Sequence, residues 1–389
     1  MADTIRKTFK YKLKPTPDQD RTLESVLWHC RTLYNTALEQ RKTWWERGQG
    51  KSATYYQQKA ELPDLKTACP DYSEINAQVL QDVLLRLDRT FQAFFRRITA
   101  GETPGYPRFQ GRTRYHSFTY PQVGEHGGAR LDNGFVVLSK IGRVAVRWSR
   151  PLEGTPKTVM ISKEAGGWYV CFSCTDVPTE PLPQTGRETG IDVGLKVFLT
   201  TADGQAAENP RHYRTAERRL AKAQRRVSRR KKGSHRRRKA IALLRRAHQR
   251  VQRQRRDFHH KTALALLRQY DVIYLEDLRV RNLVRNSHLA KSISDAGWAA
   301  FRTILEGKAV YAGRQVIAVP PQYTSQECSG VLPDGSRCGA RVAKSLSVRT
   351  HVCRSCGLVL DRDENAARNI LRAGQARQAL TWPGAASVA

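Results

Sequence analysis

The chain has 389 residues, and its 68 lysines and arginines exceed its 35 acidic residues by 33. This surplus, with an isoelectric point near 10.3, indicates a polyanionic partner such as nucleic acid, because solubility alone requires far less charge. No apolar run approaches the ~18 residues of a membrane span, and the N-terminus lacks the apolar core of a secretion signal. We therefore expect an intracellular protein of about two or three domains, with no membrane partner.

The N-terminal region predicts a strand followed by helices. Phe9, Tyr11 and Leu13 alternate with lysines, which is typical of a strand with one buried and one basic face. Residues 16–19 (TPDQ) have the pattern of a capping box at the start of a helix. Cys30 lies in the apolar stripe of that helix, so we expect it to be a core residue.

The helices after the first strand are expected to form a recognition domain over residues 16–114. Several of its polar positions could contact bases. These candidates are Tyr55, Gln58, Asn76 and Gln81.

Short strands with Gly and Asn turns follow and predict a small β-barrel, the wedge domain, formed by residues 1–15 and 115–182. Cys171 and Cys174 have the spacing of a zinc knuckle. However, residues three apart on a strand face opposite sides, and no second pair lies nearby, so we expect no zinc there.

Residues 211–260 are the most basic stretch, with 21 lysines and arginines against Glu217 and Asp257. Apolar residues recur at helical spacing on both sides of Gly233 and Ser234, which predicts a helical hairpin over 211–268. Such a charge would repel itself without phosphate nearby, so we expect it to bind nucleic acid. The candidate residues are Arg225, Arg226, Arg229, Arg230, Lys231, Lys232, Arg236, Arg237 and Arg238.

Two strands carry acidic residues suited to metal ions. Asp192 lies on a strand between Gly190 and Gly194, which we expect to leave room for a metal ion and a phosphate. A buried strand further on ends in Glu276 and Asp277. Strand alternation alone does not choose between these two acids.

A third acidic segment lies at a helix start. Asp363 shares the packing face with Ala366, Ala367 and Ile370, and a carboxylate there is costly unless a cation compensates it. Asp363 is therefore interpreted as a metal ligand, and Asp361 as the N-cap. Three acids from distant segments are what a two-metal phosphodiester site requires.

Four cysteines near the C-terminus predict one structural zinc ion. Cys353 and Cys356 form a knuckle with Gly357, and Cys328 and Cys338 are the nearest further ligands. The nine residues between this first pair exceed the usual two to four, but they contain a Pro-Asp-Gly turn that can return Cys338 to the ion.

The motifs GIDVGLKVF, VIYLEDL, SISDAGW, PPQYTSQEC, SVRTHVCRSCG and DRDENAARNI occur in this order. Together they resemble the TnpB family of transposon-encoded RNA-guided nucleases, which are similar to ancestors of type V CRISPR effectors. The resemblance implies an α+β multidomain protein whose nuclease domain is RuvC-like, with an RNase H fold. By resemblance, its metal-binding acids are Asp192, Glu276 and Asp363.

The domains expected on this basis are a nuclease domain of residues 187–321 and 357–372, a zinc-ribbon insert of 322–356 and a flexible tail of 373–389. The implied partners are a guide RNA and double-stranded DNA beside a short flanking motif, and the cofactors are two Mg²⁺ ions and one Zn²⁺ ion. We expect a monomer with its RNA, cytoplasmic in a prokaryote and associated with the nucleoid when bound to DNA.

Three alternatives remain. A guided DNA binder that has lost cleavage would have a substituted acid, but all three acids are present. A strand-joining tyrosine transposase would need a histidine pair and a nucleophilic tyrosine, and no such motif is seen. An unguided nuclease would not co-purify with a defined RNA.

Overall fold

The structure is a computed structural model and describes residues 4–48, 50, 52–345 and 347–381. The chain divides into two compact units, Met1–Pro178 and Thr179–Ala389. The boundary lies at Pro178, and the finer domain limits stay predictions. Within the described residues, no helix is long and apolar enough to cross a membrane.

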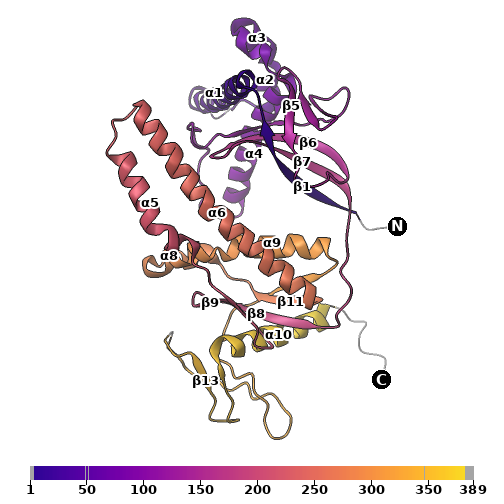
Figure 1. The fold of residues 1–389 in the computed structure, drawn as a ribbon, viewed down its shortest axis with the longest axis vertical. Helices are drawn as coiled ribbons and strands as arrows, with labels where there is room; N and C mark the ends of the chain where they lie inside the picture. The colour runs from indigo at the N-terminus through magenta and orange to yellow at the C-terminus, as the bar shows by residue number, and fades with distance from the viewer. Residues whose placement is uncertain (1–3, 49, 51, 346, 382–389) are drawn as a thin grey trace. The chain divides into compact units, whose positions relative to one another are not determined.

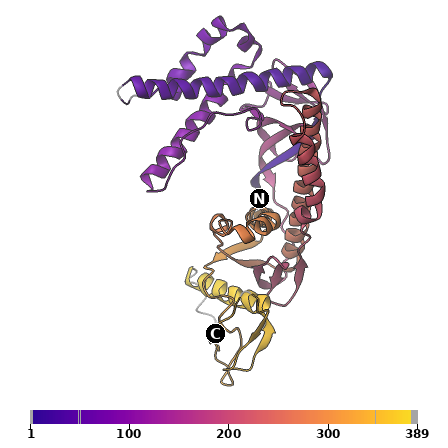
Figure 2. The same cartoon turned by 90° about the vertical axis from the view of Figure 1, so that its left-hand side faces the viewer.

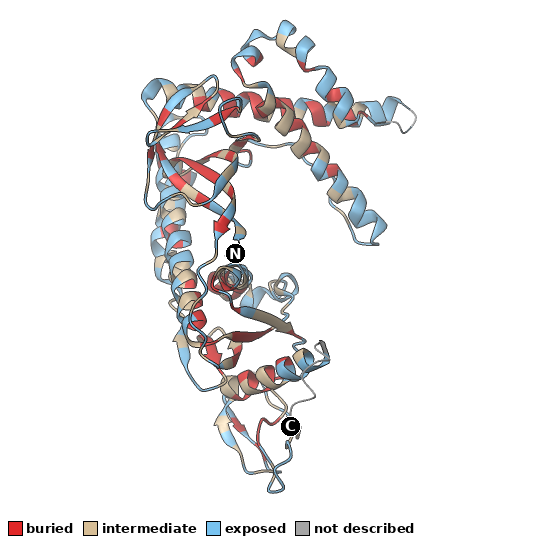
Figure 3. Ribbon diagram, turned by 90° about the vertical axis from the view of Figure 1, so that its right-hand side faces the viewer, coloured by how far each residue is buried: buried red, intermediate tan, exposed pale blue. Residues whose placement is uncertain are grey.

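A seven-stranded antiparallel sheet lies at the centre of the first unit, with the order β2-β6-β7-β1-β5-β4-β3. As predicted, the N-terminal strand joins the later ones, and its residues Phe9, Tyr11 and Leu13 are buried. Figure 3 shows buried residues in these strands and along the helices of the same unit. The strands are β1 (Thr4–Lys14), β2 (Ser117–Tyr120), β3 (Ala129–Asp132), β4 (Phe135–Leu138), β5 (Gly142–Arg147), β6 (Thr155–Glu164) and β7 (Gly167–Pro178).

The helices of the first unit lie between β1 and β2 in sequence, and α1 packs against α4 (Figure 2). Thr16 forms the predicted capping box with Gln19, and Cys30 is fully buried, as expected. The helices are α1 (Pro17–Arg47), α2 (Tyr55–Ala60), α3 (Leu62–Ala68), the 3₁₀ helix η1 (Pro70–Glu74) and α4 (Ala77–Thr99).

The second unit contains a five-stranded sheet with the order β10-β9-β8-β11-β12. Strands β8, β9 and β10 pair antiparallel, whereas β11 runs parallel to both β8 and β12. The strands are β8 (Glu188–Val193), β9 (Val197–Thr201), β10 (Ala206–Glu208), β11 (Val272–Glu276) and β12 (Gln315–Val319). A separate hairpin is formed by β13 (Thr350–Val352) and β14 (Val359–Asp361).

Helices cover both faces of this sheet, with α9 and α10 on opposite sides (Figure 1). Ile273 and Leu275 of β11 pack with α6 and α9, whereas Val272 and Tyr274 pack with α10. The helices are α5 (His212–Ser228), α6 (His235–Gln269), α7 (Val280–Leu283), α8 (Ser287–Ala296), α9 (Trp298–Tyr311) and α10 (Arg362–Thr381).

The extent of α10 corrects the expected flexible tail. The helix continues to Thr381, although a tail was predicted from residue 373, and residues 382–389 lie outside the described part. Within this continuation Gly374 lies against the Tyr274 ring, where a Cβ would be 1.9 Å from Cδ1. The glycine allows the helix to pack directly on the sheet.

Candidate functional site

The three predicted acids meet on the face of the five-stranded sheet that α10 covers. On β11, Glu276 follows Tyr274 at the two-residue strand period and so shares its face. Asp277 instead is exposed and pairs with Arg302 at 2.6 Å. The structure therefore brings Glu276, and not Asp277, toward Asp192.

The two aspartates at the start of α10 have the predicted separate positions. Asp361 caps the helix, since its carboxylate accepts hydrogen bonds from the backbone N–H groups of Asp363 at 2.8 Å and Glu364 at 3.3 Å. Ala366, Ala367 and Ile370 are buried, and Asp363 is half-buried on the same side of the helix. The cap assignment of Asp361 is thereby confirmed.

Electrostatics connect the three carboxylates. Burial raises the pKa of Asp192 well above its usual value, and the charges of Glu276 and Asp363 raise it further. Burial also raises the pKa values of Glu276 and Asp363. A site whose carboxylates repel one another in this way gains stability from a bound divalent cation, so the donor set fits Mg²⁺.

Gly190 and Gly194, beside Asp192, were expected to leave room for a metal ion and a phosphate, and the structure shows other neighbours for them. A Cβ on Gly190 would lie 2.1 Å from the backbone oxygen of Ala367, so this glycine allows α10 to approach and does not leave room for a metal ion. A Cβ on Gly194 would lie 2.7 Å from the backbone oxygen of Val197 and 3.8 Å from Asp363 Oδ2. Gly194 therefore borders the acidic site, although its tightest neighbour is the backbone of Val197.

Two residues that contact the acids were not identified from the sequence. Thr324 donates a hydrogen bond to Glu276, which opposes the effect of burial on the pKa of that acid. Arg349 lies 3.5 Å from Asp363 and lowers its pKa against the effect of burial. Both belong to segments whose motifs were noted, but only tertiary structure places them here.

The four predicted cysteines form a compact cluster. Their sulfur atoms all lie within 4.8 Å of one another, with Cys328 and Cys353 buried. Among the described residues, no group of acidic side chains brings its oxygen atoms as close together as these sulfur atoms. This statement includes Asp192, Glu276 and Asp363. Four convergent thiols fit a tetrahedral zinc ion.

The wide spacing of the first cysteine pair is accommodated by a small hairpin. Backbone hydrogen bonds join Cys338 to Gly330 and Leu332 to Ser336, and Gly335 takes the positive φ of the turn. Gly330 also matters for the cysteine cluster, because a Cβ there would lie 2.6 Å from Cys356 Sγ. The predicted turn is present, whereas the close approach of Gly330 was not foreseen.

The cysteine segment is held to α10 by two buried asparagines. Asn365 donates to the backbone oxygen of Glu327 at 2.8 Å and accepts from the N–H of Ser329 at 3.0 Å. Asn369 donates to the backbone oxygens of Thr324 and Glu327. The cysteine cluster is thus connected to the helix that carries Asp363.

The basic hairpin is formed by α5 and α6 with the predicted break, and Ser234 caps α6. Arg237 was expected to bind nucleic acid, but its guanidinium donates to the backbone oxygens of Val227 and Arg230 at the end of α5. It therefore stabilises the turn. Near the C-terminal end of α6, Ala263, Leu266 and Leu267 are buried, whereas Ala265 is exposed.

Asp295 of the SISDAGW motif fixes the base of this hairpin. Its buried carboxylate accepts hydrogen bonds from the backbone N–H groups of Tyr213 and Arg214 in the first turn of α5. It also pairs with Arg255 of α6 at 3.1 Å. Both hairpin helices are thereby attached to α8.

Two of the predicted base-contacting residues have internal roles. Gln58 is buried, where it accepts from Arg41 and donates to the backbone of Ala37, so it cannot read a base. Asn76 caps α4 by accepting from the N–H of Gln78. Tyr55 and Gln81 are partly exposed, and their role stays a prediction.

The raised pKa of Asp192 has a measurable consequence for stability. Because its folded-state pKa lies above the unfolded value near 4, stability is lost as the pH rises through the folded pKa. In magnesium-free buffer at pH 8, Asp192→Asn should therefore unfold at a higher temperature than wild type, and the gap should narrow toward pH 5. Asp277→Asn is the control, because Arg302 lowers that pKa and the variant should gain nothing. A gap independent of pH would contradict the assignment.

Solved structures of low sequence identity share this fold. A Cas12f1–sgRNA–target DNA complex matches with a TM-score of 0.54 and 13% identity, covering 94% of this chain and 98% of that chain. The mini-RNA-guided endonuclease CRISPR-Cas_phi3 matches with a TM-score of 0.53 and 9% identity, covering 95% and 92%. The chain therefore has the α+β fold of these CRISPR nucleases.

Sequence comparisons identify the family. Residues 172–287 match the profile described as "Probable transposase" of OrfB from IS605, and residues 298–370 match "Cas12f1-like, TNB domain". Residues 1–50 match "Helix-turn-helix domain".

Individual relatives cover nearly the whole chain. A "Putative RNA-guided DNA endonuclease" from Streptomyces pristinaespiralis is 38% identical over 97% of this chain and 92% of its own. InsQ of Escherichia coli K12, described in the same words, is 31% identical over 95% and 92%. The chain belongs to the TnpB/IS605 OrfB family.

Proposed function

We propose that this protein is an RNA-guided DNA endonuclease that cleaves both target strands by metal-dependent hydrolysis. The observation that carries the proposal is the meeting of Asp192, Glu276 and Asp363 on one sheet face, from segments far apart in sequence. The descriptions of the relatives at 38% and 31% identity support the same activity.

Within this proposal, the five-stranded sheet with α10 is a RuvC-like nuclease domain of RNase H fold, and the seven-stranded sheet is a wedge barrel. Asp192, Glu276 and Asp363 would hold two Mg²⁺ ions, which supply activation of water and stabilisation of the leaving oxygen. Thr324 orients the Glu276 carboxylate through its hydrogen bond. Arg349 lies 3.5 Å from Asp363, and its positive charge opposes the increase in the pKa of Asp363 that burial causes.

The cysteine cluster would hold a structural zinc ion and act on the nuclease site indirectly. Its segment contains Arg349 and, through Asn365 and Asn369, binds the first turns of α10. Zinc binding would therefore fix the position of Asp363 relative to the sheet.

The guide RNA would bind the basic hairpin, and its pairing with one DNA strand would supply the sequence specificity. Sequencing of the RNA that co-purifies with the protein tests this directly. A discrete RNA with a constant scaffold is expected, and its absence would favour an unguided nuclease.

Replacing Arg229, Arg230, Lys231 and Lys232 with Gln should weaken RNA retention and flatten its salt dependence. Each lost phosphate contact removes roughly 0.7 to 0.9 from the logarithmic slope. Filter binding across a salt series measures this slope. Arg237→Gln is the matched control, because this guanidinium caps α5; the variant should melt earlier with an unchanged slope. A wild-type slope in the quadruple variant would show that these residues do not bind RNA.

A further inference from the structure

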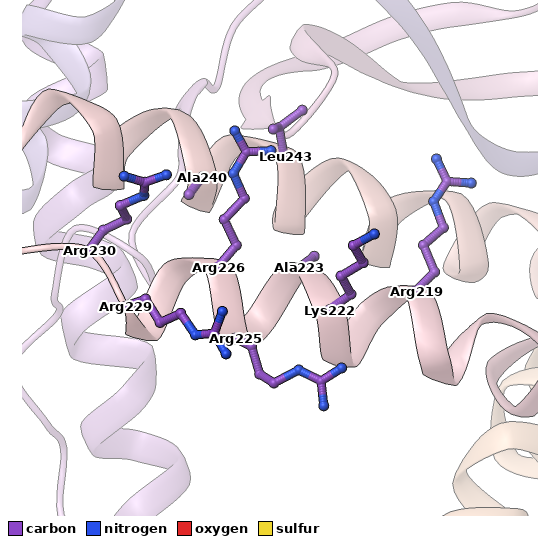
Figure 4. A pocket seen from close by; sticks show the side chains of 9 residues that line it. All are labelled: Arg219, Lys222, Ala223, Arg225, Arg226, Arg229, Arg230, Ala240 and Leu243. Carbon is purple, nitrogen blue, oxygen red and sulfur yellow. The ribbon is translucent and has the colours of Figure 1, made fainter.

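A pocket of about 930 Å³ opens between α5 and α6 of the basic hairpin (Figure 4). Most of its lining residues are cations from α5 and the turn that follows, and the others are small or apolar. The cations are Arg219, Lys222, Arg225, Arg226, Arg229 and Arg230, and the remaining residues are Ala223, Ala240 and Leu243. No acidic residue lines this pocket.

The charges of these cations are not neutralised by the protein. In the part of the chain that the structure describes, none of the six forms an ion pair, whereas Arg255 and Lys261 elsewhere on α6 pair with carboxylates. Like charges gathered around one pocket repel one another until an external anion binds. The pocket is therefore suited to an anionic ligand with more than one charge.

Leu243 limits the class of anionic ligand that fits this pocket. Its side chain is 46% exposed, although it lies in a pocket and not on an isolated surface. Figure 4 shows it projecting from α6 next to the Arg226 side chain, which extends from α5 toward α6. A ligand that covers Leu243 and also contacts the arginines needs an apolar face beside its negative charges.

An unpaired nucleotide has this combination, because its base is apolar on both faces and phosphates flank it on either side. A paired RNA offers phosphates but keeps its bases stacked inside the helix, so it would leave Leu243 uncovered. A pocket of this size also lies within the range of small-ligand sites and accommodates one nucleotide.

We propose that this pocket binds one unpaired nucleotide of the RNA, with the base against Leu243 and the flanking phosphates at Arg219 and Arg226. The proposal rests on the proposed RNA binding by the hairpin and adds its ligand class. It assigns Arg219 and Leu243 a role that the charge pattern alone does not give them.

The test compares two RNA probes on the full-length protein, freed of co-purified RNA at high salt. The probes are a labelled oligouridine and a fully paired RNA duplex of equal length. Leu243→Ala should weaken oligouridine binding on the order of tenfold, as expected for losing contact with one base, and leave duplex binding unchanged. Arg226→Gln should weaken both, because it removes a phosphate contact.

Leu289→Ala is the matched control, since Leu289 of α8 is similarly exposed, at 37%, but lies outside the pocket. It should bind both probes as wild type does.

Equal effects of Leu243→Ala on the two probes would overturn the single-nucleotide site while leaving RNA binding by the hairpin intact. Failure of the wild type to bind either probe would instead overturn the proposed function. A dimer in light scattering that Leu243→Ala disrupts, with RNA binding unchanged, would show that a second copy covers the pocket.

Discussion

Asp363→Ala should abolish cleavage of both DNA strands while RNA binding and guided DNA binding stay intact. The variant removes a proposed metal ligand, whereas Asp363 forms its ion pair with Arg349 and is not among the residues that line the hairpin pocket. We expect cleavage to fall by more than about a hundredfold, beyond the usual effect of losing a residue that only supports a ligand. Plasmid cleavage, measured beside a gel shift with the same guide, tests both parts of this prediction.

The neighbouring Asp361 provides the control. Its carboxylate caps α10, so Asp361→Ala should cost about 1 kcal/mol of stability and retain measurable cleavage. Full activity in Asp363→Ala, together with none in a well-folded Asp361→Ala, would reverse the two assignments.

Cys353→Ser should release one equivalent of zinc and strongly reduce cleavage. With one thiolate lost, the ion is bound weakly, and the segment that carries Arg349 and binds Asn365 loses its fixed shape. Metal analysis of the purified protein, together with a cleavage assay in Mg²⁺, measures both effects.

Cys171→Ser is the matched control for this experiment. Cys171 is buried on β7 and does not belong to the four-cysteine cluster, so the variant should keep its zinc and its activity. Equal zinc contents in wild type and Cys353→Ser would contradict the metal assignment.

Local signals predicted much of this site. The capping roles of Thr16 and Asp361 follow from side chains that bond to backbone only two or three residues away. The break at Gly233 and the turn at Gly335 likewise depend on nearby residues, and both glycines have positive φ. Features set within one turn of chain were therefore accessible from the sequence.

Contacts between distant segments were not accessible in this way. The choice of Glu276 over Asp277 requires knowledge of which face of β11 lies under α10. Glutamine is usually exposed, but Gln58 is buried and bonded to Arg41. Gly190 is needed for helix packing because the backbone of Ala367 lies close to it. These contacts cannot be predicted from the spacing of residues along the chain.

The hairpin between Cys328 and Cys338 affects how cysteine clusters of this kind can be searched for in genomes. Backbone pairing near Gly330 brings the two thiols into the cluster, and residues 333–337 of the turn are exposed. The length of this exposed turn could change without moving either sulfur. A search pattern that requires a fixed interval between these two cysteines would therefore miss chains with the same arrangement of four thiols.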